Sequence, residues 1–229
     1  MAATEKNKND IQKFWNVKSI IIPEVGMNEV EFQKTNKRDK LEPLKIIWSG
    51  QHTGGKALNI LLKSLVLLPD NVNWELHILG DGHMTKKWKH LSKKLKINAN
   101  CKWYGWVEKN TATEVMKSAH VLCITSVKDL TSTVTLEGLS YGLPIISIDH
   151  CGFSNVINST CGIKIPIRFP NELHHLFSNA IKNMYFDENL RRKLCKGAYL
   201  RAQSFTWYKK GEKINNIYLS LFKNKHIEK

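Results

Sequence analysis

The chain has 229 residues, 42% of them hydrophobic, and this length allows one full domain plus a further segment, with roughly 70% of the unfolded surface buried on folding. Its 35 Lys and Arg residues exceed its 20 Asp and Glu residues, which gives a net charge of +15. This charge favours an anionic partner, but its sign does not choose among phosphorylated ligands, anionic lipids and nucleic acid.

The positions of the excess lysines rank these alternatives. Many of them fall in helix-like stretches at residues 86–96 and 191–196. We interpret these stretches as solvated helix faces, with peripheral contact to an anionic membrane as the second interpretation and nucleic acid as the last.

Cysteine usage and hydropathy exclude several classes of protein. The five cysteines are odd in number and none forms a CxxC pair, so no closely spaced zinc or redox site is indicated. No apolar run reaches the roughly 18 to 20 residues that cross a bilayer, and the first residues are too polar for a signal peptide. We therefore expect a reduced, cytoplasmic protein, with contact at the inner face of the membrane left open.

Residues 1–43 do not fit the pattern of the rest of the chain. A polar, helix-like stretch ends at Phe14 and Trp15, and it is followed by one isolated strand, KSIIIPEVG at residues 18–26, and a charged linker. A lone strand needs a sheet elsewhere. We expect residues 1–43 to be the remnant of a preceding N-terminal domain together with its linker.

From Leu44 onward, short β-branched runs alternate with longer amphipathic segments, which is typical of a parallel sheet covered by helices. The expected strands span residues 44–50, 74–80, 101–106, 120–126, 144–149 and 162–167. The expected helices between them span residues 57–68, 84–95, 111–119 and 131–142. This order predicts an α/β, doubly wound, six-stranded Rossmann-like sheet with helices on both faces over residues 44–204.

Three further helices are expected without strands between them. They begin near Pro170, Glu188 and Thr206, where Pro170 suits a first turn and Thr206 suits an N-cap. The last of them forms a separate C-terminal segment, residues 205–229.

Ligands of a doubly wound sheet bind beyond the carboxyl ends of its strands, and the first loop there is rich in glycine. It runs from Gly50 through Gln51 to Lys56, so backbone amides can approach a ligand and Lys56 can supply a positive charge. The loop is not a Walker motif, because Ala57 follows the lysine. On its own, a glycine-rich turn after a strand is more often only a tight turn.

The second and third loops contain Gly80 with Gly82, and Gly105 with Trp106 and Val107. The Gly80 loop does not match the GxGxxG fingerprint, which makes a dehydrogenase the least favoured class. Trp106 could border a flat ring or could pack against the edge of the sheet.

The fourth loop leads into a helix expected to start near Thr131 or Ser132. The first amides of that helix point back toward the strand end, where they could hold a phosphate. Asp129 precedes the helix and Glu137 lies along it. Glu137 could bind a ligand, accept a structural hydrogen bond or lie at the surface.

Read together, these loops and their order resemble the C-terminal domain of GT-B glycosyltransferases of the retaining family 4, the glycosyl transferases group 1, over nearly the whole chain. The family's motifs fall on Gly50, Gln51 and Lys56, on Gly80 and Gly82, on Trp103, Gly105 and Val107, and on Asp129, Glu137, Gly142 and Pro144. A later glycine loop corresponds to residues 151–155, the closing Phe205–Trp207 resembles the start of the family's crossover helix, and KSIIIPEVG resembles the end of its N-terminal domain.

The resemblance implies a cleft for a nucleotide diphosphate sugar. Lys56 and the amides near Thr131, Ser132 and Thr133 would neutralise the diphosphate, with Gly50, Gln51 and Gly82 lining that part of the cleft. Glu137 would bind the ribose, Asp129 the transferred sugar, and Trp106 and Val107 would border the base. No metal is implied, in agreement with the lack of an Asp-x-Asp motif in the sequence.

Three positions depart from the family's pattern. Gln51 stands where an Arg is usual, so one of the two expected charges on the diphosphate is missing. Asp129 stands where a Glu is usual, which shortens the carboxylate by one methylene, and Asn155 replaces a frequent Glu.

The leading hypothesis from the sequence is the donor-binding half of a hexosyltransferase. It would act with retention on a glycan or lipid-linked acceptor in polysaccharide or envelope glycan synthesis, together with the missing N-terminal domain. A non-catalytic nucleotide-sugar binding module is the alternative, and a basic protein that binds anionic membranes or nucleic acid is the third.

Overall fold

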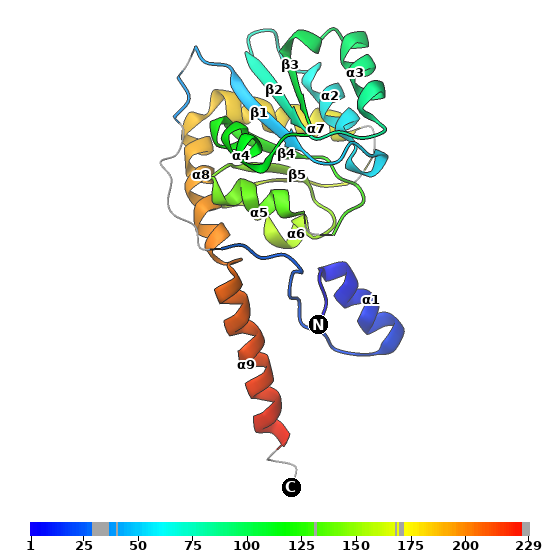
Figure 1. The fold of residues 1–229 in the computed structure, drawn as a ribbon, viewed down its shortest axis with the longest axis vertical. Coiled ribbons are helices and arrows are strands. Elements are labelled where there is room, and N and C mark those ends of the chain that lie inside the picture. Colours follow the sequence, from blue (N-terminus) through cyan, green and yellow to red (C-terminus); the bar gives the residue numbers. More distant parts are fainter. Residues whose placement is uncertain (29–36, 40, 131, 168, 170–171, 226–229) are drawn as a thin grey trace.

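The structure is a computed structural model, and it describes the whole chain apart from residues 29–36, 40, 131, 168, 170–171 and 226–229 (Figure 1). Its centre is a six-stranded sheet with the strand order β3-β2-β1-β4-β5-β6. All neighbouring strands pair in parallel, for example with Leu44 opposite Trp74 and Ile145 opposite Gly162. The strands are β1 (Leu44–Ser49), β2 (Trp74–Leu79), β3 (Cys101–Gly105), β4 (Val121–Ile124), β5 (Ile145–Ile148) and β6 (Gly162–Ile165).

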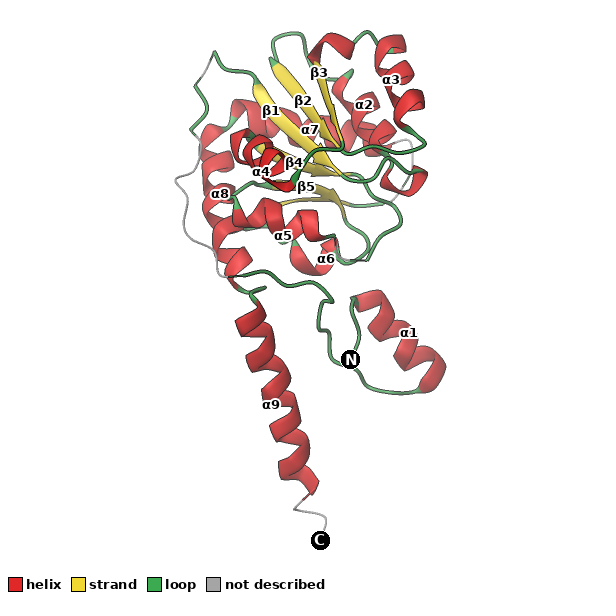
Figure 2. Ribbon diagram, viewed as in Figure 1, coloured by secondary structure: helices red, strands yellow, loops and turns green. Residues whose placement is uncertain are grey.

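Helices cover both faces of this sheet (Figure 2). The helices are α1 (Glu5–Trp15), α2 (Leu58–Leu65), α3 (Thr85–Lys94), α4 (Lys109–Ser118), α5 (Thr133–Ser140), α6 (Phe153–Val156), α7 (Leu173–Phe186), α8 (Glu188–Gln203) and α9 (Trp207–Lys225). Two short 3-10 turns, η1 (Gly54–Lys56) and η2 (Asn98–Asn100), complete the described elements.

The four inner strands, β1, β2, β4 and β5, are largely buried on both faces, and their alternate side chains enter two separate cores. Ile46 and Trp48 of β1 pack with α2, α3 and α7, for instance against Leu61. Ile47 enters the second core, which α4, α5, α6 and α8 cover. The predicted fold class, a doubly wound sheet with helices on both faces, is therefore confirmed.

The predicted elements are largely present, with each strand shorter than predicted by one to three residues. Thr206 occupies the predicted N-cap of the last helix, since its Oγ1 accepts a hydrogen bond from the backbone N–H of Lys209 at 3.2 Å. The start near Pro170 cannot be compared, because Pro170 lies outside the described residues. The four-residue helix α6 was not predicted, since so short a segment carries no helical periodicity.

The predicted strand KSIIIPEVG is wrong. This segment makes a single parallel bridge, Ala2 to Ile21, and the following residue, Met27, makes another to Thr206, but no strand is assigned over it. A strand needs a continuous neighbour to satisfy its backbone, and no described segment runs alongside this one. The division of the chain at residues 43 and 204 stays a prediction.

The two ends of the chain extend away from the sheet. In Figure 1, α9 projects as a rod from the base of the sheet domain, and α1 lies beyond α6. Within the described part of the chain, no helix is both long and apolar enough to span a membrane.

Candidate functional site

The candidate site lies where β1 and β4 are neighbours in the middle of the sheet. From β1 the chain builds outward to β2 and β3, and from β4 it builds in the other direction to β5 and β6. The loops after β1 and β4 therefore separate at their carboxyl ends, which is where doubly wound sheets bind ligands. Lys56 follows β1 and Asp129 follows β4.

Lys56 and Asp129, which are 73 residues apart in the sequence, form an ion pair in the structure. The pair joins Lys56 Nζ to Asp129 Oδ2, and the side chains are only 22% and 18% exposed. The second carboxylate oxygen of Asp129 accepts a hydrogen bond from the backbone N–H of Leu130 at 2.9 Å. Asp129 thus holds the lysine that was expected to meet a diphosphate, so the ammonium is neutralised in this structure.

The two loops are also joined through their backbones. The N–H of Val127 donates to the carbonyl of Gly55 at 2.9 Å, and Thr125 Oγ1 donates to the carbonyl of Lys56 at 2.8 Å. The indole of Trp48, on β1, donates in turn to Thr125 Oγ1 at 3.0 Å. These bonds fix the backbone on both sides of the ion pair.

Glycines of the first two loops allow a close approach between backbones. Gly80 has a φ of +104°, and a Cβ there would lie 2.1 Å from the carbonyl oxygen of Gly50. A Cβ on Gly82 would lie 2.7 Å from the carbonyl oxygen of His52. The structure therefore accounts for Gly82 through loop packing, and its predicted contact with the donor stays a prediction.

His52 is a site residue that the sequence analysis missed. Its ring is buried among three indoles, with centroid distances of 5.5 Å to Trp48, 5.2 Å to Trp88 and 6.0 Å to Trp103. Its Nδ1 lies 2.7 Å from Thr85 Oγ1, at the start of α3. Burial lowers the pKa of His52, so the imidazole is neutral and ties the first loop to the second.

A carboxylate completes this link between the loops. Asp81 Oδ1 accepts hydrogen bonds from Thr85 Oγ1 at 2.5 Å and from the backbone N–H of Gly82 at 2.8 Å. The Thr85 and Gly82 bonds hold the pKa of Asp81 below its usual value. No local sequence signal marks His52, because its hydrogen-bond partner Thr85 lies 33 residues further along the chain.

Helix α5 begins at Thr133, at the end of the fourth loop. Its N-cap residue, Ser132, makes no side-chain capping hydrogen bond, which leaves first-turn amides without a side-chain acceptor from the cap. Thr133 is exposed and Ser132 is half-buried. Thr131 lies outside the described residues, so its predicted contact has no structural counterpart here.

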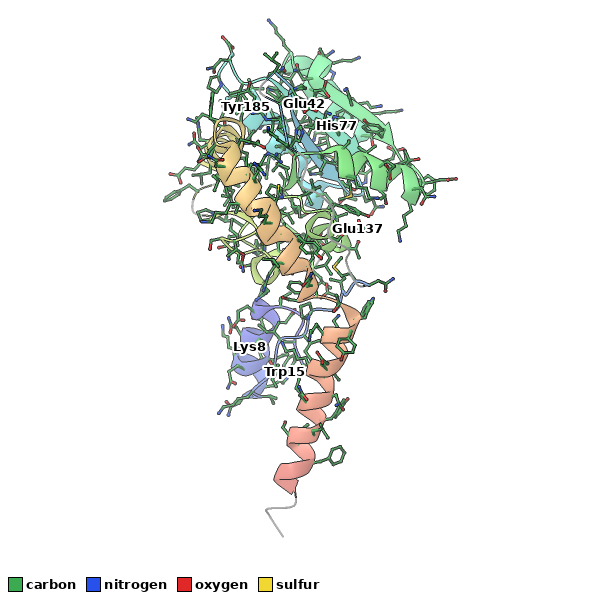
Figure 3. The ribbon with its side chains drawn as sticks, turned by 90° about the vertical axis from the view of Figure 1, so that its left-hand side faces the viewer. Lys8, Trp15, Glu42, His77, Glu137 and Tyr185 are labelled. Carbon is green, nitrogen blue, oxygen red and sulfur yellow. The ribbon has the colours of Figure 1, made fainter. Side chains whose placement is uncertain are left out.

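Glu137 is half-buried on α5, on the lower side of the sheet domain in Figure 3. Among the described residues, no hydrogen bond or ion pair of its carboxylate is found, whereas its backbone carbonyl accepts from Tyr141 N–H and Ser140 Oγ. Glu137 therefore has an available acceptor, and it is not part of the ion pair formed by Asp129.

Trp106 and Val107 differ in exposure although they are adjacent. The indole of Trp106, just after β3, is 79% exposed, so it does not pack against the edge of the sheet. Val107 is half-buried and packs on the second core. Gln51 is exposed in the first loop, near the half-buried Gly50.

The glycine loop at residues 151–155 connects this site with the N-terminal segment. The N–H of Gly152 donates to the carbonyl of Leu130 at 2.9 Å, directly after Asp129. Asn155 Oδ1 accepts from the backbone N–H of Glu5, the first residue of α1, at 3.2 Å. The start of α1 thus contacts a loop of the candidate site.

No group of three or more His, Cys, Asp or Glu side chains that could hold a metal ion occurs among the described residues. The expectation that no metal takes part stays a prediction. The available chemistry is that of one lysine, two carboxylates, helix-terminal amides and an exposed indole.

Comparison with known proteins matches this chain to glycosyltransferases. The family described as glycosyl transferases group 1 matches residues 29–201. A lipopolysaccharide 1,6-galactosyltransferase of Salmonella typhimurium is 36% identical over 78 residues, which cover 33% of this chain and 22% of that protein.

Two solved structures are similar over nearly the whole chain. The apo form of the lipopolysaccharide outer core galactosyltransferase WaaB has a TM-score of 0.77 at 20% identity, covering 96% of this chain and 61% of that one. The pneumococcal O-GlcNAc transferase GtfA, solved with UDP and GlcNAc, also has a TM-score of 0.77, at 15% identity, covering 96% and 44%. The chain thus spans less than two thirds of each of these proteins.

Proposed function

The chain belongs to the glycosyl transferases group 1 family, and from this membership we propose that it forms the donor-binding half of a glycosyltransferase. It would transfer a hexose-type unit from a nucleotide diphosphate sugar, with retention of anomeric configuration. The acceptor would be a glycan or lipid-linked glycan of polysaccharide or envelope synthesis. The observation that carries this proposal is the ion pair of Lys56 and Asp129 beyond the carboxyl ends of β1 and β4.

When the donor binds, its diphosphate replaces Asp129 as the partner of Lys56. As the acceptor hydroxyl oxygen forms its bond to the anomeric carbon, the bond from that carbon to the phosphate oxygen breaks. The leaving diphosphate takes the electron pair, gains negative charge and receives the proton of the acceptor hydroxyl. Lys56, together with the amides at the start of α5, stabilises that charge without a metal. Asp129, released from Lys56, accepts hydrogen bonds from hydroxyls of the transferred sugar.

The nucleoside would lie on the outer side of this arrangement. The exposed indole of Trp106 offers a flat surface for the base, and Val107 borders it. Glu137 has a carboxylate for which the described residues provide no partner, and it would accept hydrogen bonds from the ribose hydroxyls.

The acceptor would be bound mainly by an N-terminal domain, either in the same polypeptide or as a separate one. On this chain, the surfaces that contact such a domain would include α1, whose exposed Trp15 is labelled in Figure 3, and the exposed apolar residues of α9. On this basis we expect the chain as given to bind the donor nucleotide and to transfer sugar inefficiently.

Binding of UDP, GDP and ADP, measured by calorimetry, tests the donor site. At least one should bind with millimolar or better affinity, and Lys56→Ala should weaken it about tenfold or more, because a charge-assisted contact contributes about 1.5–3 kcal/mol. Glu137→Ala should also weaken binding. Lys193→Ala on α8, which removes an exposed charge far along the chain, is the matched control.

Asp129→Asn separates the two members of the ion pair. Since it frees Lys56 without removing it, nucleoside diphosphate binding should be equal to or tighter than that of the unchanged chain. Sugar transfer, measured once the N-terminal half is supplied, should fall. No binding of any nucleotide, unchanged binding in both Lys56→Ala and Glu137→Ala, or full turnover by this chain alone would contradict the proposal.

A non-catalytic nucleotide-sugar binding module is the second candidate, and Gln51 favours it. The neutral amide of Gln51 stands where a second cation would be expected at the diphosphate. Nucleotide binding without any transfer in the presence of the N-terminal half would support this candidate instead.

A further inference from the structure

A groove lies between α2 and α3, on the side of the sheet domain that Figure 1 shows farthest from α9. Its volume is about 470 Å³, a size that accommodates a small ligand or a lipid headgroup. One end of the groove is at Gly54, two residues before Lys56 in the first loop. The groove therefore borders the candidate donor site but is not part of it.

The groove has lysines on both walls. Lys63 of α2 stands on one side, and Lys87 and Lys94 of α3 stand on the other, with His90 between them in the sequence. All four side chains are exposed. A ligand in the groove would thus meet positive charge from two helices rather than from one.

This positive charge is not neutralised by neighbouring carboxylates. Between Asp81 and Glu108 the sequence has no acidic residue. Lysines elsewhere in the chain, such as Lys45, Lys102 and Lys164, form ion pairs. For Lys63, Lys87 and Lys94 no ion pair is found in the part of the chain that the structure describes.

The floor of the groove is apolar. Met84 and Leu91 are half-buried there, and Trp88 is 1% exposed. A floor of this kind does not suit nucleic acid, because no aromatic face lies open in it for a base to stack on. Lysines above apolar side chains match an amphiphile in which a phosphate adjoins hydrocarbon.

We propose that the groove between α2 and α3 binds the headgroup region of anionic phospholipids and thereby places this face of the domain on a membrane. The phosphate lies among Lys63, Lys87 and Lys94, and the glycerol and upper acyl chains contact Met84 and Leu91. The inference does not require the donor site. If both proposals hold, the membrane carries the lipid-linked acceptor close to the first loop.

The test uses the full chain and vesicles of phosphatidylcholine with or without phosphatidylglycerol, in a sedimentation assay. The chain should bind the anionic vesicles and release them at high salt. K63Q/K87Q/K94Q should lower the partition coefficient about tenfold or more, since each lysine near an anionic surface contributes several-fold. R192Q/K193Q/K196Q, which removes the same charge from exposed positions on α8, should change it less than about twofold.

Two further measurements separate the alternatives. Nucleoside diphosphate binding should be the same in both triple variants, so a failure of the donor site is detected independently of the groove. Equal losses in the two triple variants, equal binding to neutral vesicles, or tighter binding to a single-stranded oligonucleotide than to anionic vesicles would overturn the proposal. Thermal unfolding of each variant confirms that these exposed substitutions leave the fold intact.

Discussion

The strands of the sheet and the helix α1 place their apolar side chains in opposite environments. Ile46, Val121 and Ile145 in the central strands are fully buried. Phe14 and Trp15 at the end of α1 are 68% and 69% exposed, and α1 has no buried residue. The sheet domain provides its own core, whereas α1 contributes nothing to that core.

Helix α9 resembles α1 in this respect. Tyr218, Leu221 and Phe222 are more than half exposed on its outer part. Because monomeric proteins rarely expose several large apolar side chains together, both ends of the chain have the character of contact surfaces. Stability should therefore depend on the sheet domain, and association on the ends.

The largest expected effect comes from a matched pair of phenylalanines, one in each region. Phe177→Ala on α7 removes a side chain that is 0% exposed and should cost about 3–5 kcal/mol of unfolding free energy, because it leaves a cavity in the first core. Phe14→Ala in α1 should change it by less than about 0.5 kcal/mol. Urea unfolding measures both, and similar losses in the two variants would remove the distinction between the regions.

A second contrast lies within the sheet domain, between two glycines of its loops. Gly80→Ala should cost about 3 kcal/mol, because the residue has a φ of +104° and its Cβ would meet the carbonyl of Gly50. Gly54→Ala should be nearly neutral, since no atom lies within 4 Å of a Cβ there. Unfolding and nucleotide binding should both respond to the first variant, and a fully stable Gly80→Ala would contradict the packing of the two loops.

Lowering the pH should destabilise the sheet domain through the protonation of His120. Burial, together with the positive charges of Arg191, Lys45 and Arg38, lowers the pKa of His120 to about 4 against the opposing effect of Glu42. The unfolded chain, with a His pKa of about 6.5, takes up protons first, so stability is lost as the pH falls from about 6.5 toward 4. Between pH 7 and pH 5 this loss should be about 2 kcal/mol.

The replacement His120→Asn should remove that part of the pH dependence, while His90→Asn at an exposed position should keep it. Burial also lowers the pKa values of His52 and His77, so a smaller dependence of the same sign should remain. Unfolding curves at several pH values provide the measurement. A His120→Asn variant with the full dependence would assign the effect to other groups.

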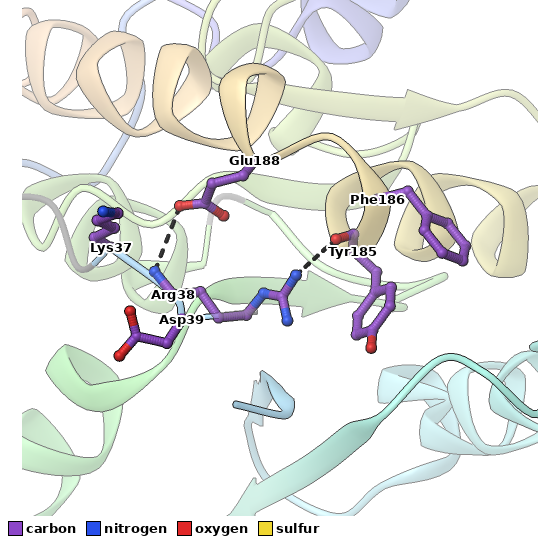
Figure 4. A pocket seen from close by; sticks show the side chains of 6 residues that line it. All are labelled: Lys37, Arg38, Asp39, Tyr185, Phe186 and Glu188. Carbon is purple, nitrogen blue, oxygen red and sulfur yellow. Dashed lines mark hydrogen bonds between the residues drawn. The ribbon is translucent and has the colours of Figure 1, made fainter. Parts of the chain in front are cut away.

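The smallest expected effect concerns Arg38, at the border between the linker and the sheet domain. The Arg38 guanidinium donates to the carbonyls of Glu42 and Tyr185 at 2.8 and 2.7 Å, and it lies 4.5 Å from the centre of the Tyr185 ring. Figure 4 shows this contact in a cavity of about 480 Å³, where the N–H of Arg38 also faces Glu188. The end of the linker is thus fastened to α7 and α8.

Arg38→Ala should therefore cost about 1–2 kcal/mol of unfolding free energy, and the neighbouring exposed Lys37→Ala should cost almost none. Chemical unfolding of the two variants makes the comparison. If Arg38→Ala is neutral, the linker belongs with the ends of the chain rather than with the sheet domain.

Local patterns were sufficient to predict most of the elements. Runs such as Leu44–Ser49 and Ile145–Ile148 are short, apolar and bounded by turn residues, so their strands follow from neighbouring residues alone. KSIIIPEVG has the same local character and still forms no strand, because pairing depends on a partner elsewhere in the chain. The short helix α6 was missed for the opposite reason, since four residues have too little pattern to recognise.

The sequence predicts the individual residues of the candidate site but not the contacts between them. Lys56, Asp129 and Glu137 were selected as separate ligand contacts from the loops that carry them. The structure joins Lys56 to Asp129, leaves Glu137 without a partner among the described residues, and adds His52 as the link between two loops. Whether each contacts a donor stays a prediction.

The fold class, the order of the loops at the carboxyl edge and the resemblance to a family follow from the sequence, because periodicity and turn chemistry act between near neighbours. The packed fold was needed to show that Asp129 neutralises Lys56, that the backbone of Gly50 requires a glycine at position 80, and that Arg38 fastens the linker. The residues of the ion pair are 73 positions apart, and they meet because β1 and β4 are neighbours in the sheet. Strand order is a property of the whole packed chain, so no local pattern could have specified these contacts.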